Sequence, residues 1–193
     1  MVFSSIVFLL YFLPLFFLVY YSVSERYKNY VILAASIVFY SWGAPKFVFV
    51  IIASTIIDFH IVKHLHRSHK VLHRKWLLAA SIFINLGLLL YFKYANFFVE
   101  NVNTILTNLG YQDIAWTSVA LPIGISFYTF QTLTYSIDVY RRVHDPLDKV
   151  TDYLLYIMSF PQMIAGPIVR FNTIADQITT RLESIDDKLI GFY

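Results

Sequence analysis

The sequence predicts an all-α fold, a polytopic transmembrane helical bundle of about five spans with a broken or re-entrant segment and a surface amphipathic helix. Hydrophobic residues make up 58% of the 193 residues, charged residues make up 14%, and the mean hydropathy is +0.61. These values are typical of polytopic membrane proteins. Uncharged runs, the longest of them able to cross a bilayer of ~30 Å, follow one another between short charged links. The absence of cysteine excludes disulfides, zinc-thiolate sites and thiol nucleophiles.

Three spans are expected before the first strongly basic loop. Residues 3–22 carry no charge and lack both the basic start and the cleavage site of a signal peptide, so they predict an uncleaved first span. Residues 29–42 form the second span and residues 46–62 the third. Asp58 lies toward the far end of the third span. An acid in a span is a functional candidate by default, but the nearby polar loop favours snorkelling of this carboxylate to water.

Residues 63–75 form the most basic loop, with five Lys or Arg residues, four histidines and no acid. The positive-inside rule therefore makes this loop cytoplasmic and places the N-terminus outside the cell inner membrane. With this orientation, ten of the Lys and Arg residues before Arg170 lie on the cytoplasmic side of the membrane, and only Lys46 and Lys93 lie on the external side. We expect the loop to contact anionic headgroups, at ~1 kcal/mol per charge, in preference to nucleic acid. Its histidines have helical spacing, but flanking cations and missing acids oppose a metal, and we expect none.

The fourth span is expected at residues 76–98 and the fifth at residues 116–138. Along the fifth span Gly124, Gln131 and Asp138 recur every seven residues, so one helical face is polar and should look at protein. The amide of Gln131 has two hydrogen-bond donors and an acceptor, and the backbone of its own helix cannot satisfy them. Two roles for Gln131 are therefore equally open: packing against another helix and lining a cavity. The hydroxyl groups on this helix are expected to bond back to its own carbonyls, namely those of Ser126, Thr129, Thr132 and Ser136.

Beyond the fifth span the chain becomes irregular. Asp138 precedes Arg141 and Arg142 by three and four residues, a spacing that predicts a structural clasp at the membrane surface. Residues 152–170 are apolar but interrupted by prolines and a glycine, which predicts a broken or re-entrant helix lined by protein or by a watery cavity. Residues 171–188 then predict an amphipathic helix on the cytoplasmic surface, with Ile174, Ile178, Leu182 and Ile185 on one side.

The central motifs resemble a known family. Residues 121–142, LPIGISFYTFQTLTYSIDVYRR, and residues 146–171, PLDKVTDYLLYIMSFPQMIAGPIVRF, are similar to the central signature of the membrane-bound O-acyltransferases. The similar branch contains the alginate O-acetyltransferases and the membrane protein that D-alanylates teichoic acids. Residues 32–42, ILAASIVFYSW, resemble its second-helix pattern. The resemblance covers the N-terminal part of the family's domain, and the apolar run at residues 189–193 favours a truncated protein.

The resemblance implies transfer of an acyl group, most simply acetyl, from a thioester-type donor on the cytoplasmic side to hydroxyls of an extracytoplasmic polysaccharide. No bound cofactor is implied, whereas partner proteins for acyl donation or acceptor handling are. The family's catalytic histidine lies in a later membrane segment, within a His-Gly motif ahead of a Trp, and no such motif occurs here. We therefore expect no catalytic residue in this chain, which would supply scaffold and substrate-path walls and be inactive alone.

The resemblance also selects site residues. A PQ-to-GP-to-R pattern is matched by Pro161, Gln162, Gly166, Pro167 and Arg170, which are expected to form a broken element at the floor of the donor access. Arg170 would meet a donor phosphate or a carrier acid, or instead a lipid headgroup. With Gln131 and Asp138 these residues are the substrate-path candidates.

Two other classes of function remain open on the residues alone. A glycan-precursor transporter or flippase also uses a polar-faced helix and a broken half-helix, and an inverted copy of this half in a longer protein would favour it. A non-catalytic membrane interaction subunit would use the polar stripe only to pack against partner helices. An activity that survives Gln131→Leu would favour that reading.

Overall fold

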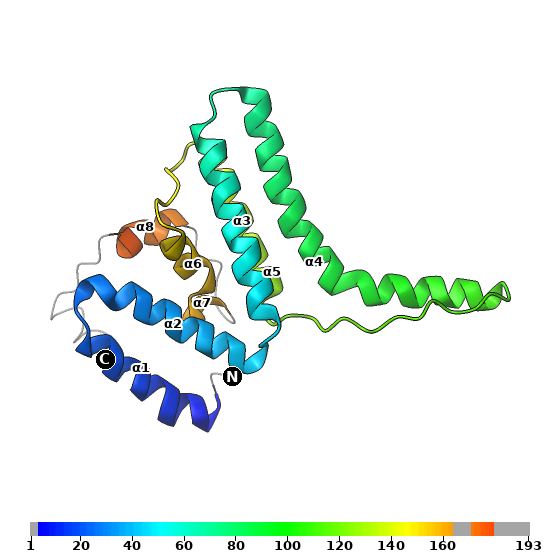
Figure 1. The fold of residues 1–193 in the computed structure, drawn as a ribbon, viewed down its shortest axis with the longest axis horizontal. Coiled ribbons are helices and arrows are strands. Elements are labelled where there is room, and N and C mark those ends of the chain that lie inside the picture. Colours follow the sequence, from blue (N-terminus) through cyan, green and yellow to red (C-terminus); the bar gives the residue numbers. More distant parts are fainter. Residues whose placement is uncertain (1–3, 164–170, 180–193) are drawn as a thin grey trace.

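The structure, a computed structural model, describes residues 4–163 and 171–179. Within these residues every regular element is a helix, which confirms the predicted all-α class (Figure 1). In chain order the elements are η1 (Phe8–Phe12), α1 (Leu13–Ser22), α2 (Glu25–Gly43), α3 (Phe47–Arg67), α4 (Val71–Asn108), α5 (Ile125–Tyr140), α6 (Val150–Met158), α7 (Phe160–Met163) and α8 (Phe171–Thr179).

Helices α3 and α4 form the long apolar centre of the structure. They are antiparallel neighbours joined by a short turn, and α5 lies beside both of them (Figure 1). Among the described residues, these two helices are long and apolar enough to cross a bilayer. Helix α3 runs five residues beyond the predicted end of the third span, to Arg67. Asp58, the twelfth of its 21 residues, therefore lies at mid-helix.

Helix α4 is much longer than the span predicted at residues 76–98. Its 38 residues measure about 57 Å at ~1.5 Å each, whereas the hydrocarbon core is ~30 Å thick. Figure 1 shows that α4 changes direction along its length and that its C-terminal half leaves the other helices. We call this half and the extended return at residues 111–122 the arm.

Three side chains on α4 hold the return segment of the arm. Asn96 accepts hydrogen bonds from Trp116 Nε1 and Val119 N, at 3.0 and 2.8 Å, and donates to Val119 O at 2.8 Å. Asn103 similarly bonds both backbone groups of Ile114, and Thr107 Oγ1 donates to Asp113. These residues are seven and four apart, so they share one face of the helix.

Helix α5 begins at Ile125, although the fifth span was predicted to begin at residue 116. Two local features explain the late start. Pro122 disfavours helical geometry at the residue before it. Gly124, directly before the helix, has a φ of 78°, which a residue with a Cβ rarely adopts.

The N-terminal helices are held by aromatic packing. Helix α1 packs against α2, whose C-terminal end lies at the lower end of α3 in Figure 1. Five phenylalanines from η1, α1, α2 and α7 meet with ring centroids 5.2–6.4 Å apart, largely edge to face: Phe8, Phe12, Phe16, Phe39 and Phe160. Such pairs add stabilisation beyond their buried area, so this cluster joins the start of the chain to α7.

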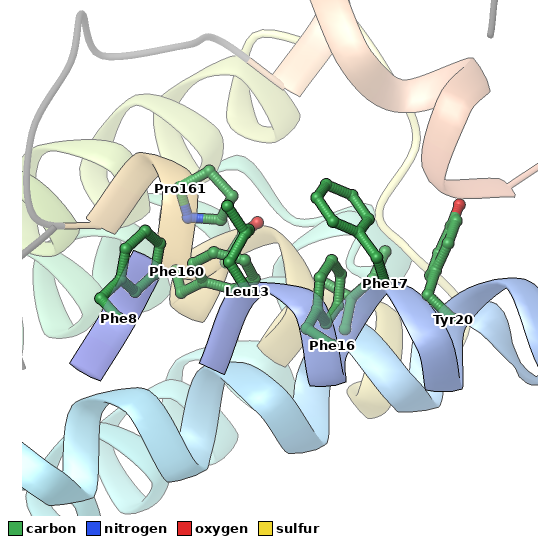
Figure 2. Close-up of a pocket in the computed structure, with 9 residues that line it drawn as sticks. Phe8, Leu13, Phe16, Phe17, Tyr20, Phe160 and Pro161 are labelled. Atoms are coloured by element: carbon green, nitrogen blue, oxygen red, sulfur yellow. The ribbon is translucent and has the colours of Figure 1, made fainter. Parts of the chain in front are cut away.

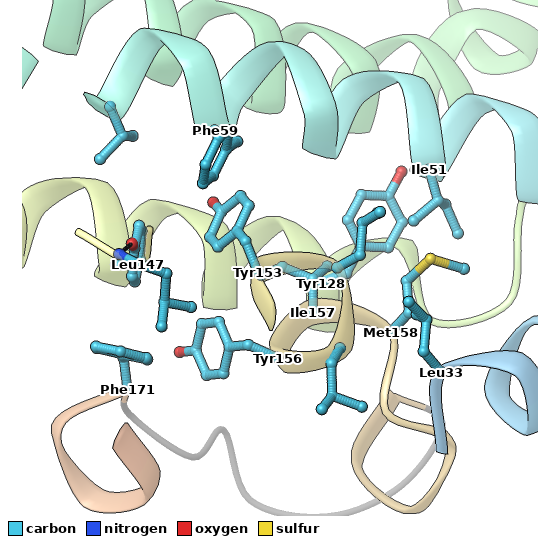
Figure 3. Packing of buried hydrophobic residues seen from close by; sticks show 14 of the residues in the cluster. Leu33, Ile51, Phe59, Tyr128, Leu147, Tyr153, Tyr156, Ile157, Met158 and Phe171 are labelled. Atoms are coloured by element: carbon cyan, nitrogen blue, oxygen red, sulfur yellow. Dashed lines mark hydrogen bonds between the residues drawn. The ribbon is translucent and has the colours of Figure 1, made fainter. Parts of the chain in front are cut away.

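Helix α6 is the buried centre of the bundle. Every residue from Tyr153 to Met158 is buried, and α6 packs against α2, α3, α5 and α8. Figure 3 shows Tyr153 beneath Phe59 of α3, and Tyr156 between α6 and Phe171 of α8. The described part of the predicted surface helix is α8, which turns Phe171 and Ile178 into this core. Residues 180–188 lie outside the described residues.

The basic loop and the link between α5 and α6 meet at one end of the bundle. Lys63 Nζ donates to Asp148 O at 2.9 Å, Arg74 donates to Tyr140 O, and His66 lies 3.6 Å from a carboxylate oxygen of Asp145. Because these contacts fix both segments to the same end, they must share one side of the membrane.

Candidate substrate-path site

The helix break between α6 and α7 is the centre of the candidate site. Helix α6 ends at Met158, and Ser159 takes a non-helical conformation with φ −52° and ψ 116°. The backbone hydrogen bonds of the helix cannot continue past this point, because Pro161 has no N–H to donate to the carbonyl four residues earlier. The N–H of Phe160 donates instead to Ser36 Oγ on α2, at 3.0 Å. The side chain of Ser36 therefore satisfies a backbone group that the break exposes.

Three cavities follow one another along the seam between α2 and α6. The first, of about 310 Å³, has a charged lining at the start of both helices: Glu25, Arg26, Asn29, Tyr30, Lys149, Asp152 and Ile178. The second, of about 180 Å³, shares Ile178 with the first and is lined by Ile32, Leu155, Tyr156, Ser159, Gln162 and Ile174. The third, of about 630 Å³, shares Ile32 and Ser159 with the second. The polarity of the seam thus falls from its charged end to its aromatic end.

Pro161 and Gln162 both follow the break, on α7, but they line different cavities. Pro161 is exposed and lines the largest cavity together with Phe8, Leu13 and Phe16, as Figure 2 shows. Gln162 lines the smallest cavity, and its Nε2 is buried without a hydrogen-bond partner. A buried donor without a partner is costly, so it is suited to a ligand that supplies an acceptor.

Gln131 lies in the protein interior and contacts the helix that carries the break. Its side chain is buried, and its Nε2 donates to Tyr156 O at 2.7 Å. It therefore joins α5 to α6 one turn before Ser159. The hydroxyls of Thr132 and Ser136 bond back to their own helix as expected, at 2.8 and 3.0 Å, whereas Thr129 Oγ1 is buried without a partner.

Asp138 is not joined to the break by any contact in the described structure. It is half-buried near the end of α5, and no ion pair links it to Arg141 or Arg142, although all three residues are described. The predicted clasp is wrong because the helix ends at Tyr140: Arg142 has a φ of 59° and both arginines turn away as exposed residues. Gly166, Pro167 and Arg170 lie outside the described residues.

Asp58 is a residue whose surroundings the sequence reasoning predicted wrongly. The expected snorkelling is wrong, because Asp58 has 0% exposure. Its carboxylate contacts four polar side chains from three other helices: Ser81 and Asn85 of α4 at 2.5 and 3.1 Å, Ser136 of α5 at 3.2 Å, and Tyr153 of α6 at 2.7 Å. We call these five residues the Asp58 cluster.

The signal that could have found this cluster is present in the sequence. Ser81 and Asn85 are four residues apart on an apolar helix, so they form a polar spot on one face. Uncharged polar groups on neighbouring spans are the natural partners of an intramembrane acid. The prediction failed because it ended the third span too early, which placed Asp58 near water.

No three His, Cys, Asp or Glu side chains among the described residues come together as a metal site. His64 bonds the carbonyl of His60 at 2.7 Å, His66 faces Asp145, and His144 packs against Tyr135 and Phe171. The histidines of the basic end are therefore divided among separate local contacts.

The chain has relatives among bacterial proteins that are named as O-acetylating enzymes. It is 40% identical over 188 residues to a protein of Pseudomonas aeruginosa named "Probable alginate O-acetylase AlgI", and 39% identical to one of the same name in Azotobacter vinelandii. These matches cover 96% of this chain and 36% and 38% of the relatives. A peptidoglycan O-acetyltransferase of Helicobacter pylori is 26% identical over 92% of the chain. The chain thus spans little more than a third of the length of these relatives.

Fold and site define an all-α membrane protein with a buried polar interior and a broken helix beside a line of cavities. With these relatives, the chain belongs to the membrane-bound O-acyltransferase family, in the branch of the alginate O-acetylases. No family model matches the chain, and no solved structure matches it.

Proposed function

We propose that this chain is the scaffold and substrate-path part of an O-acetyltransferase of the cell inner membrane. The enzyme moves an acetyl group from a thioester-type donor on the cytoplasmic side to hydroxyls of an extracytoplasmic polysaccharide. The names of the relatives support the reaction class, because these names describe O-acetylation of alginate or of peptidoglycan. The catalytic histidine that the family resemblance implies would come from outside this chain.

The orientation follows from charge. With the basic loop of residues 63–75 in the cytoplasm, its cations face anionic headgroups, and the N-terminus and the arm lie outside. The contacts of Lys63 and Arg74 with the α5–α6 link support this arrangement, because they hold the second positively charged segment at the same end. Partner proteins that deliver the acyl donor or handle the acceptor would then approach from opposite ends.

The line of cavities along the α2–α6 seam carries the proposal for the donor path. A thioester donor joins a polar carrier group to a short apolar acyl group. The charged cavity, which holds Arg26 and Lys149, suits the carrier group. The smaller cavity, of about 180 Å³ and lined by Ser159 and Gln162, would receive the acyl end.

Gln162 is the residue that would contact the donor. Attack of a hydroxyl on a thioester needs a base for the hydroxyl proton and hydrogen-bond donors for the carbonyl oxygen. The unpartnered Nε2 of Gln162 is such a donor, and Gln162 is one of the residues that line the cavity. Gln131 contributes indirectly, by tying α5 to the carbonyl of Tyr156.

The test is polysaccharide O-acetylation in cells that depend on the full-length enzyme. Gln162→Leu removes one neutral donor, worth about 0.5–1.5 kcal/mol, so the acetylation rate should fall roughly two- to tenfold. Gln112→Leu, in the exposed return segment of the arm, is the matched control and should acetylate normally. Equal acetylation by both variants at equal enzyme levels would remove Gln162 from the path.

A further inference from the structure

The oxygens of the Asp58 cluster, together with the carbonyl oxygen of Thr132, form more close pairs than the hydroxyl hydrogens of the cluster can fill. Five pairs of oxygens lie within hydrogen-bond distance. They are Ser81 Oγ with Asp58 Oδ1 at 2.5 Å, Ser81 Oγ with Ser136 Oγ at 3.1 Å, Ser136 Oγ with Asp58 Oδ2 at 3.2 Å, Ser136 Oγ with Thr132 O at 3.0 Å, and Tyr153 OH with Asp58 Oδ2 at 2.7 Å.

Three hydroxyl hydrogens must serve these five contacts if Asp58 is ionised. Ser81, Ser136 and Tyr153 supply one each, and a carboxylate or a carbonyl supplies none. Both hydrogens of Asn85 Nδ2 are already used, one toward Asp58 Oδ1 and one toward Ser81 O. Two of the five contacts would then bring together oxygens with no hydrogen between them.

The surroundings of Asp58 contain no compensating cation among the described residues. Lys63, one turn along the same helix, donates to Asp148 O. The groups from α4 that face the carboxyl are uncharged. From α5 and α6 the titratable neighbours are Tyr153 and, behind it, Tyr135, whose ring centroid lies 4.7 Å from that of Tyr153. An unpaired buried charge inside a membrane bundle is expensive.

We propose that the Asp58 cluster is a proton-binding site, in which Asp58 is a neutral carboxylic acid that donates from Oδ2 to Ser136 Oγ. Ser136 then gives its own hydrogen to Thr132 O, Ser81 donates to Oδ1, and Tyr153 donates to Oδ2. This arrangement fills four of the five contacts with four hydrogens. It joins α3, α4, α5 and α6 through a neutral network.

A proton fits this site better than a metal cation. The pair Ser81 Oγ and Asp58 Oδ1, at 2.5 Å, is closer than the ~2.9 Å that separates neighbouring oxygen ligands of an octahedral Mg²⁺ ion. Asp58 is also the sole acid of the cluster, whereas hard cations are usually bound by several oxygen ligands with more than one charge. The proposal is independent of the acyl-transfer proposal, because it concerns the helical bundle alone.

Infrared spectroscopy of the intact membrane protein in lipid nanodiscs tests the proposal. A protonated carboxyl gives a carbonyl stretch at higher frequency than the amide and carboxylate bands. At neutral pH the wild type should show such a band, and Asp58→Asn should lack it. Asp113→Asn, an exposed acid on the arm, is the matched control and should keep the band. A wild-type spectrum without an Asp58-dependent carboxylic acid band at neutral pH would overturn the proposal.

A second variant keeps the test decisive if Asp58→Asn fails to assemble. Tyr153→Phe keeps the carboxyl but removes the donor to Oδ2, so the band should shift in frequency. An unshifted band would mean that the protonated group is not Asp58 and would contradict the proposal. Thermal unfolding adds an independent readout: the wild type should lose stability relative to Asp58→Asn as the pH rises above ~4, where an aspartate of the unfolded chain ionises.

Discussion

At the scale of single residues, the Asp58 cluster shows how a buried acid, which is unfavourable inside a membrane, is held in the bundle by hydrogen bonds to neighbouring helices. Its contacts join α3 to three neighbours, α4, α5 and α6, so the cluster sets the relative positions of four helices. The same residues show where sequence reasoning succeeds. The inward position of Gln131 followed from the heptad spacing of polar residues on α5, whereas its partner Tyr156 O could not be predicted, since it depends on how α6 packs.

Replacement of Asp58 by alanine should destabilise the protein strongly. The change leaves Ser81, Asn85 and Tyr153 without their acceptor inside the bundle, and an unsatisfied buried donor costs ~1–3 kcal/mol. We expect a loss of about 2–4 kcal/mol in the free energy of unfolding, measured in detergent or nanodiscs. Asp113→Ala is the control. If Asp58→Ala lost no more stability than this control, the cluster would not hold the helices together.

Replacement of Gln131 by leucine should have a smaller effect. It removes one hydrogen bond between α5 and α6 but keeps the volume of the side chain. Such bonds inside membrane bundles contribute about 0.6 kcal/mol, with a maximum near 1.7. The unfolding midpoint should therefore fall slightly and acetylation should fall through the altered position of α6. Unchanged midpoint and activity would assign Gln131 to packing alone.

At the scale of elements, helix boundaries were the least predictable feature. The sequence indicated the break near Pro161 because proline removes a donor, but it did not indicate that Ser36 on α2 would satisfy the N–H of Phe160. It also did not indicate the arm. Asn103 and Thr107, which follow the predicted end of the fourth span at residue 98, are instead on α4, where their side chains hold the return segment.

Ser36→Ala tests the contact that stabilises the break. It leaves the buried N–H of Phe160 without an acceptor, which should cost about 1–2 kcal/mol in the free energy of unfolding. Ser41→Ala, near the end of the same helix and away from the break, is the matched control. Equal unfolding midpoints for the two variants would contradict the role of Ser36.

Asn96→Ala tests the arm. The variant loses three hydrogen bonds to the return segment and should expose it to protease. The segment contains no Lys or Arg but has Tyr111 and Trp116, so chymotrypsin is the suitable probe. Asn101→Ala, whose side chain bonds only a carbonyl of its own helix, should leave the cleavage rate unchanged. Equal rates for both variants would show that Asn96 does not hold the segment.

At the scale of the whole molecule, acyl transfer from a cytoplasmic donor to an external acceptor requires a defined orientation in the membrane. The chain contains no cysteine, so single cysteines report their side directly. A membrane-impermeant maleimide should label Gln112→Cys in intact cells, and His69→Cys only after permeabilisation. The reverse pattern would invert the orientation and with it the direction of acyl transfer.

The most direct test of the central claim is to block the line of cavities at Ser159, which lines two of them. Ser159→Cys in the full-length enzyme is treated with a bulky maleimide, and polysaccharide O-acetylation is measured before and after. Phe49→Cys, exposed at 72% on the outer surface of α3, is the control. Labelling should abolish acetylation by Ser159→Cys and leave the control active. Full acetylation by labelled Ser159→Cys would show that the acyl donor does not pass the helix break.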